Sequence, residues 1–282
     1  MAAVTRSVVK KVTALFILIF ILSADLRAQY SEFGLLGGAS YYMGDLNPDI
    51  PFKQVMPAAG IFYRHNFNDR FSARLTFTGA YLKADDAKSK VRSQIERNLN
   101  FESWLFDFAL TGEFNFFRYA PGDMEHPVTP FLFGGIALFK FNPRTTASDG
   151  HKYELQPLGT EGQGTTFYPD RKKYSLTTAS IPFGIGLKAN LSKSFTVGIE
   201  WGMRYTFTDY LDDVSGTYAS PVVIQAERGD IAYELANRSG ISDEVLEGRQ
   251  RGNSKTNDWY SFALISLSLN IKARPQKCPA YE

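Results

Sequence analysis

The chain has 282 residues and a formal charge of only +2, which excludes the strongly basic surface expected of a nucleic-acid-binding protein. Aromatic residues make up 15% of the chain and the mean hydropathy is −0.21. This mean excludes a protein with several transmembrane helices, whereas the alternating strands of a barrel in lipid average to such a value. The single cysteine excludes an internal disulfide framework and a cysteine-based zinc site.

The first 28 residues predict export from the cytoplasm. Arg6, Lys10 and Lys11 precede an apolar core, Val12 to Leu22, and the small residue Ala28 follows at a suitable cleavage position. This core is too short to cross about 30 Å of hydrocarbon as a helix. Residues 1–28 are therefore predicted to be a signal peptide.

Beyond the signal peptide, apolar and polar residues alternate with a period of two in eight long segments. The clearest is Phe195–Thr208, in which seven apolar residues oppose seven small or polar ones. Strands of soluble sheets are usually about 5–6 residues long, so segments of this length favour strands that cross a membrane. The predicted strands are 31–42, 57–67, 71–83, 101–116, 128–142, 174–190, 195–208 and 259–271.

The connections between these segments alternate between long and short. The long ones are 43–56, 84–100, 143–173 and 209–258, and the short ones are 68–70, 117–127 and 191–194. Outer-membrane barrels have this alternation, with short periplasmic turns and long external loops. We predict an all-β fold, an eight-stranded antiparallel transmembrane β-barrel over residues 29–271, in contact with outer-membrane lipid. Both termini are expected in the periplasm, with 272–282 as a C-terminal tail. A lipocalin-like soluble barrel, apolar inside, is the alternative.

The polar faces of the strands place charges inside the barrel. Side chains fill an eight-stranded barrel, so a wide pore is not expected. Buried charges require partners, and with five basic and three acidic residues the network needs hydroxyl groups or water to complete it. A structural polar core is the favoured interpretation, and a proton or ion path is the alternative. The predicted interior charges are Arg64, Arg74, Asp107, Glu113, Lys140, Lys188, Glu200 and Arg204.

The sequence contains little that predicts catalysis. His65, His126 and His151 fall in a strand end, a short turn and a long loop, without metal-ligand spacing or an evident nucleophile. His151, in a long loop, leaves a lipid-modifying barrel enzyme as an alternative. We predict a protein that is not an enzyme and that uses no cofactor.

Three carboxylates, Asp209, Asp212 and Asp213, lie within five residues at the start of the last long connection. They could contribute oxygen ligands to Ca²⁺, which takes 6–8 of them. The favoured interpretation is that they form Asx-type turns that order the loop root, and no metal is predicted. The connection 209–258 carries ten acidic and five basic residues, which disfavours an adhesin for anionic surfaces, and a short helix is predicted within 231–251.

Three stretches resemble a known family. They are SEFGLLGGASYYMGDLNP (31–48), NLNFESWLFDFAL (98–110) and RYTFTDYLDDVSGTY (204–218), and they cover about a sixth of the chain. They resemble the PorG-like outer-membrane barrels of the type IX secretion system of Bacteroidota.

The resemblance implies a barrel that anchors or positions a periplasmic ring, built of a lipoprotein and its partner subunit, at the outer membrane. That system exports proteins that bear a C-terminal sorting domain and, in some members, supports gliding motility. A small structural barrel or weak conduit of the OmpA or OmpW kind is the alternative.

Cys278 lies in the predicted periplasmic tail, between Pro275 and Pro279. A single cysteine in an oxidising compartment has no partner in its own chain. It is either an incidental free thiol or the site of an intermolecular disulfide to a periplasmic subunit. The resemblance offers the ring lipoprotein as the candidate partner.

Overall fold

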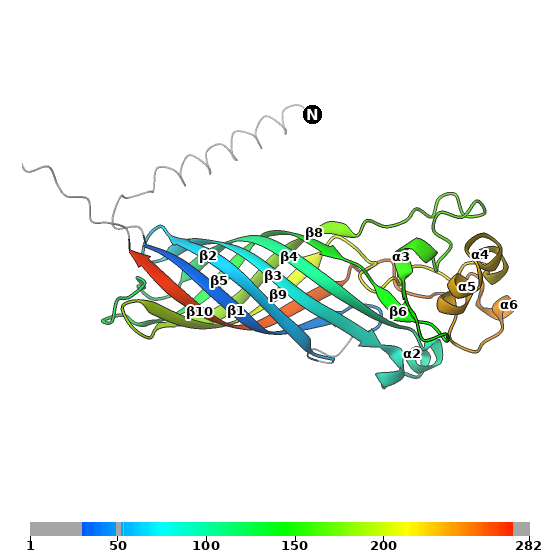
Figure 1. The fold of residues 1–282 in the computed structure, drawn as a ribbon, viewed down its shortest axis with the longest axis horizontal. Helices are drawn as coiled ribbons and strands as arrows, with labels where there is room; N and C mark the ends of the chain where they lie inside the picture. Colours follow the sequence, from blue (N-terminus) through cyan, green and yellow to red (C-terminus); the bar gives the residue numbers. More distant parts are fainter. Residues whose placement is uncertain (1–29, 49–51, 53, 273–282) are drawn as a thin grey trace, which may run out of the picture.

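The computed structural model describes residues 30–48, 52 and 54–272. Eight long strands form a closed antiparallel barrel in the order β3-β2-β1-β10-β9-β8-β5-β4, and pairing between β3 and β4 closes it (Figure 1). The barrel strands are β1 (Tyr30–Met43), β2 (Met56–Asn66), β3 (Phe71–Asp85), β4 (Asn100–Asn115), β5 (Val128–Phe141), β8 (Thr177–Asn190), β9 (Phe195–Thr206) and β10 (Trp259–Lys272). The predicted eight-stranded antiparallel barrel is confirmed, with each predicted strand end within three residues of the observed one.

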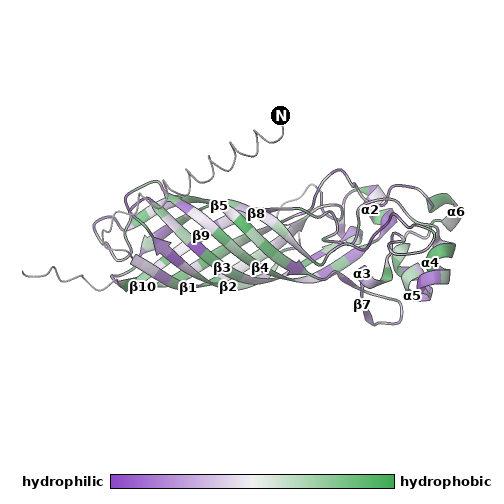
Figure 2. Ribbon diagram, turned by 90° about the horizontal axis from the view of Figure 1, so that it is seen from above, coloured by the Kyte–Doolittle hydropathy of each residue, from purple (hydrophilic) through white to green (hydrophobic). Residues whose placement is uncertain are grey.

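The barrel is apolar outside and polar inside. Along each strand, exposed large apolar side chains alternate with buried ones, and the outward residues include Trp104, Ile136 and Leu138, which are 57%, 67% and 61% exposed. Figure 2 shows apolar residues repeating along the barrel strands. In water such a surface would be strongly unfavourable, so the outer face is suited to hydrocarbon. The fold is thus that of an outer-membrane barrel, not that of a lipocalin-like soluble barrel.

The two ends of the barrel differ. At one end, here called the turn end, the short connections 67–70, 116–127 and 191–194 join the strands, β1 begins and β10 ends. At the other, the loop end, the connections are 44–55, 86–99, 142–176 and 207–258, and their described residues form what we call the loop cap (Figure 1). Among the residues that the structure describes, no helix is long and apolar enough to cross a membrane.

The loop cap has its own secondary structure. The hairpin β6 (Arg144–Thr146) and β7 (Lys152–Glu154) extends the sheet beside β4. The short helical elements are η1 (Asp86–Lys88), α2 (Arg92–Arg97), α3 (Leu155–Leu158), α4 (Pro221–Arg228), α5 (Asp230–Ala236) and α6 (Asp243–Leu246). The helix expected within 231–251 corresponds to α5 and α6, whereas α4, which has proline in its first turn, was not expected.

The loop cap packs directly on the barrel. Leu46, Leu211, Val214 and Leu235 are fully or almost fully buried, and they share one apolar cluster with barrel residues such as Phe262. Burying a Leu or Val side chain stabilises a fold by about 1.5–3 kcal/mol. Much of the loop cap is therefore a folded continuation of the barrel core.

Candidate functional site

The barrel interior holds a network of paired charges near the turn end. Its members come from six strands, and all are at most 9% exposed. The cations are Arg64, Arg74 and Lys188, and the carboxylates are Glu32, Glu113 and Glu200.

Glu113 on β4 is the centre of this network. Its Oε2 lies 2.9 Å from Nε of Arg64 and 2.9 Å from Nζ of Lys188, and its Oε1 lies 3.1 Å from Nε of Arg74. Glu32 accepts a second contact from Arg64 at 2.9 Å, and Glu200 accepts one from Nη2 of Arg74 at 3.2 Å. Every member thus has an opposite charge within contact distance, as burial in a low-dielectric interior requires.

A second, smaller set of interior charges lies closer to the loop end. The Tyr260 hydroxyl donates to Oδ2 of Asp107 at 2.6 Å, and Nε of Arg204 lies 3.9 Å from the same oxygen. The Arg204 guanidinium also lies over the ring of Phe262, 4.7 Å from its centroid. A tyrosine and an aromatic face therefore supplement a long ion pair.

Two assignments of interior charges need correction. Lys140 on β5 faces outward. Both faces of this strand are apolar, so the alternation alone did not identify which face is the inner one. Glu32 on β1 faces inward and was missed, although the outward residues Phe33 and Leu35 beside it carry the signal that would have found it. With these changes the strand side chains that the structure describes contribute four cations and four carboxylates to the interior. The other seven predicted interior residues lie where expected.

Aromatic side chains fill the space between the charges. The Arg64 guanidinium lies 4.9 Å from the ring centroid of Phe62, and that of Arg74 lies 5.2 Å from the centroid of Phe133. At the turn end Tyr119, from the connection 116–127, is 1% exposed, and its hydroxyl lies 2.8 Å from Oδ1 of Asn190. The interior is therefore packed and closed at this end, as expected for eight strands.

The three aspartates at the root of the last connection face different partners. Asp212 accepts from the Tyr42 hydroxyl at 2.6 Å and from the backbone N–H of Val214 at 3.0 Å, which is an Asx turn. Asp213 accepts from the Tyr174 hydroxyl at 2.7 Å and lies 3.8 Å from Nη2 of Arg251.

The three carboxylates do not converge on one point, and the geometry of Asp212 matches the predicted ordering of the loop root.

Burial changes the proton affinity of these loop carboxylates. Partial burial raises the pKa of Asp209 to about 7, and the negative charges of Asp45 and Glu161 act in the same direction. Burial also raises the pKa of Asp213 to about 6, although Arg251 and the hydroxyls of Thr160 and Tyr174 oppose the shift. The carboxyl groups at the root of the loop cap therefore keep their protons to a higher pH than free carboxyl groups do.

Tyr42 joins the barrel to this loop root. Its single hydroxyl lies 2.6 Å from Oδ2 of Asp212 and 2.9 Å from Oδ1 of Asp258. One phenolic proton can serve only one of the two carboxylates, so the arrangement favours a proton on the other. In agreement, burial and mutual repulsion raise the pKa of both Asp212 and Asp258.

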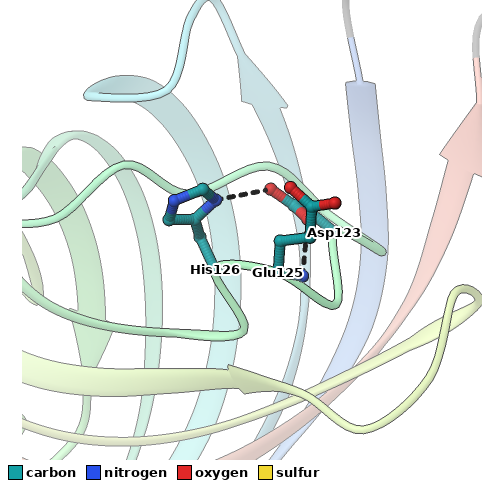
Figure 3. Close-up of side chains that lie close together, drawn as sticks. All are labelled: Asp123, Glu125 and His126. Carbon is teal, nitrogen blue, oxygen red and sulfur yellow. Dashed lines mark hydrogen bonds and ion pairs between the residues drawn. The ribbon is translucent and has the colours of Figure 1, made fainter.

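A third group of ionisable residues lies in the turn 116–127. Asp123, Glu125 and His126 place their ligand-type atoms within 4.8 Å of one another, and Figure 3 shows the His126 ring directed at the Asp123 carboxylate. Nδ1 of His126 is 3.2 Å from Oδ2 of Asp123, whose other oxygen accepts from the backbone N–H of Glu125 at 2.8 Å. The hydrogen bonds explain the cluster as an Asx turn with a histidine contact on the surface.

The remaining predicted residues are separate from these groups. His65 lies on the outer face near the turn end, with Nδ1 3.2 Å from the hydroxyl oxygen of Ser31, and His151 is exposed in the loop cap. The signal peptide 1–28 and Cys278 lie outside the described residues.

The family model described as Domain of unknown function (DUF6089) matches residues 10–158 and 163–220. No curated protein matches the chain.

Several solved structures are similar to this chain. The N-terminal β-barrel domain of OprF from Pseudomonas aeruginosa is 12% identical, with a TM-score of 0.37 and coverage of 87% of this chain and 100% of that one. Neisserial surface protein A is 9% identical, with a TM-score of 0.41 and coverage of 86% and 96%. Ail of Yersinia pestis is 8% identical, with a TM-score of 0.38 and coverage of 86% and 99%. With TM-scores this low, the assignment of the fold rests on the strand pairing of this chain itself.

Proposed function

The chain belongs to the family described as Domain of unknown function (DUF6089). We propose that it is a non-enzymatic outer-membrane barrel of the type IX secretion machinery. In this role it anchors or positions a periplasmic ring, formed by a lipoprotein and its partner subunit, at the outer membrane. The resemblance of residues 31–48, 98–110 and 204–218 to PorG-like barrels supports this role.

The observation that carries the proposal is the filled interior. Glu113 and its three cations occupy the barrel near the turn end, and Tyr119 covers them. A barrel packed in this way offers no wide passage for a protein or a solute. Its function must then reside on its surfaces, which favours an anchor over a conduit.

The turn 116–127 is the surface best suited to a partner in the periplasm. It is the longest connection at the turn end, and Asn190 holds it by donating to the backbone oxygens of Ala120 and Asp123 at 2.9 Å each. Arg118 and Met124 are exposed on it, Met124 by 50%. A preordered segment with exposed apolar and charged groups binds a partner without paying much conformational entropy.

The test is affinity capture of the tagged full-length protein from membranes solubilised in mild detergent. We expect the ring lipoprotein and its partner to be recovered with the parent and to be reduced at least tenfold with Arg118→Glu/Met124→Glu. Val222→Glu, which changes an exposed apolar residue of the loop cap (73% exposed), is the matched control and should retain both subunits. Recovery of the barrel alone with every variant would instead favour a structural barrel of the OmpA or OmpW kind.

A further inference from the structure

At the loop end, the outward face of the described strands carries charged side chains in one sector only. Among the described strand side chains they are Lys83 and Asp85 on β3, Glu102 on β4 and Lys140 on β5. These strands are neighbours, with Lys83 directly opposite Glu102. If these residues served only to mark the edge of the apolar belt, charges would be expected all around the barrel. Their restriction to one sector indicates a local role.

The hairpin β6–β7 adds further charges to this sector. Arg144 lies opposite Glu102 across the pairing of β6 with β4, and Lys152 forms an ion pair with Glu102. Nη2 of Arg144 is 2.6 Å from Oε1 of Glu154.

Asp85 is the N-cap residue of η1, and its Oδ1 accepts a hydrogen bond from the backbone N–H of Ala87 at 3.0 Å. Its carboxylate keeps its negative charge in this cap, so four cations face three carboxylates, which leaves an excess of one positive charge. The cations are Lys83, Lys140, Arg144 and Lys152, and the carboxylates are Asp85, Glu102 and Glu154.

A pocket of about 660 Å³ lies between these charges and the apolar surface below them. Its apolar wall includes Trp104 and Phe106, and its charged residues are the cations Lys140, Arg144 and Lys152 and the carboxylate Glu102, which is paired with Lys152. The Tyr81 ring lies edge-on to Trp104, with centroids 5.2 Å apart. Lys140 is directly opposite Phe106 in the β4–β5 register and forms no hydrogen bond or ion pair within the described part of the chain. The pocket thus combines an aromatic wall with an unpaired ammonium group.

The depth of Lys140 places this pocket at a membrane interface. Every outward position of β5 from Val128 to Leu138 is apolar or glycine, and Lys140 is the next outward residue. Ten residues of a strand span about 33 Å, and a tilt of about 40° reduces this to about 25 Å along the membrane normal, the height of the apolar belt of such barrels. The ammonium group of Lys140 therefore lies at the level of lipid head groups.

We propose that this pocket binds the phosphorylated head group of an anionic membrane lipid, with Lys140, Arg144 and Lys152 contacting the phosphate. Trp104 and Phe106 pack against the apolar part of the same lipid. A basic pocket next to the hydrocarbon boundary is suited to this chemistry, because each cation near an anionic lipid contributes a favourable interaction. The inference requires only that the barrel spans a membrane, and it is independent of a role in secretion.

The test uses Trp104 as a reporter inside the pocket. The chain has three tryptophans, so Trp201→Phe/Trp259→Phe leaves Trp104 as the single emitter. The full-length protein in nanodiscs of phosphatidylcholine receives 10% of brominated phosphatidylglycerol or, in parallel, 10% of brominated phosphatidylcholine. We expect stronger quenching by the anionic lipid than by phosphatidylcholine. This preference should fall about fivefold in Lys140→Gln and about fivefold further in Lys140→Gln/Arg144→Gln.

Three controls make the outcome decisive. Lys140→Arg should retain the preference, and so should Lys193→Gln, which removes an exposed cation at the turn end. Inorganic phosphate, compared with chloride at equal ionic strength, should leave the preference for the anionic lipid unchanged. Free phosphate lacks the apolar part of the lipid that packs against Trp104 and Phe106, so it should not displace the lipid. Equal quenching by the two lipids, or a preference that persists in the double variant, overturns the proposal. If the preference is lost in phosphate but not in chloride, the pocket binds free phosphate, and the lipid site is overturned.

Discussion

Arg64 and Arg74 lie directly opposite each other on β2 and β3, and both guanidinium groups are ion-paired to the single carboxylate of Glu113. Two buried like charges at neighbouring positions require opposite charges nearby, and Glu113 on a third strand supplies one that contacts both. Glu113 also holds Lys188, so one carboxylate connects three cations. The integrity of the barrel interior depends on this residue more than on any other carboxylate of the network.

The first prediction concerns this dependence. Glu113→Gln should destabilise the folded barrel by about 3–5 kcal/mol, because it leaves buried cations without their main partner. Glu200→Gln is the matched control, since among the described residues Glu200 forms an ion pair with Arg74 alone and is 9% exposed, and we expect a clearly smaller effect. Urea unfolding followed by the shift of the folded band on unheated gels measures both. Equal stability of Glu113→Gln and the parent would contradict the central position of Glu113.

The second prediction concerns the closure of the turn end. Tyr119→Phe should lower stability by about 1 kcal/mol, because its hydroxyl no longer reaches Asn190 and Thr196. Tyr119→Ala should cost about 3–5 kcal/mol, because it also creates a cavity. Tyr63→Phe removes a hydroxyl hydrogen bond on the outer surface, to Ser31, and should have little effect. The same unfolding assay applies, and identical midpoints for the Tyr119 and Tyr63 variants would refute the assignment.

The third prediction concerns pH. The pKa values of Asp209 and Asp213 are raised to about 7 and about 6, from about 3.9 in an unfolded chain. Between pH 4 and 7 the folded loop cap therefore binds more protons than the opened one, so its stability falls as the pH rises through this window. Hydrogen exchange of residues 209–216, corrected for intrinsic rates, should show weaker protection at pH 8 than at pH 5.

Asp209→Asn tests the origin of this pH dependence. The amide does not titrate, so the difference in protection between pH 5 and pH 8 should shrink. Asp123→Asn is the control at the opposite end, where hydrogen bonding, first from the backbone N–H of Glu125, lowers the pKa of Asp123. An unchanged pH dependence in Asp209→Asn would show that this carboxyl group does not contribute.

The fourth prediction concerns Cys278. If the tail lies in the periplasm, oxidation can join Cys278 to a thiol of another subunit. Non-reducing gels of cells whose thiols are trapped before lysis should then show a heavier band that reductant removes and that Cys278→Ser lacks. Detection of the monomer alone under these conditions would identify an unpaired thiol.

The number of strands, their limits and most of their inner faces could be predicted from the amino-acid sequence alone. Period-two alternation is a local property, since successive side chains of a strand point to opposite sides. Arg74, Asp107, Glu200 and Arg204 were therefore placed inside from their neighbours alone. Alternating connection lengths likewise assigned the long and short links to opposite ends of the barrel.

Which charges meet, and which way the ambiguous strand faces point, depends on the three-dimensional fold. β5 carries Phe131, Phe133 and Phe139 inside and Leu132, Ile136 and Leu138 outside, so its alternation is silent on Lys140. Only the pairing of Phe106 with Lys140 fixes its outward position. Glu32 acquires its partners in the same way, from Arg64 on β2 and from Ser268, 236 residues away on β10. Such contacts depend on the register and closure of the sheet, which are relations between distant segments and leave no local pattern in the chain.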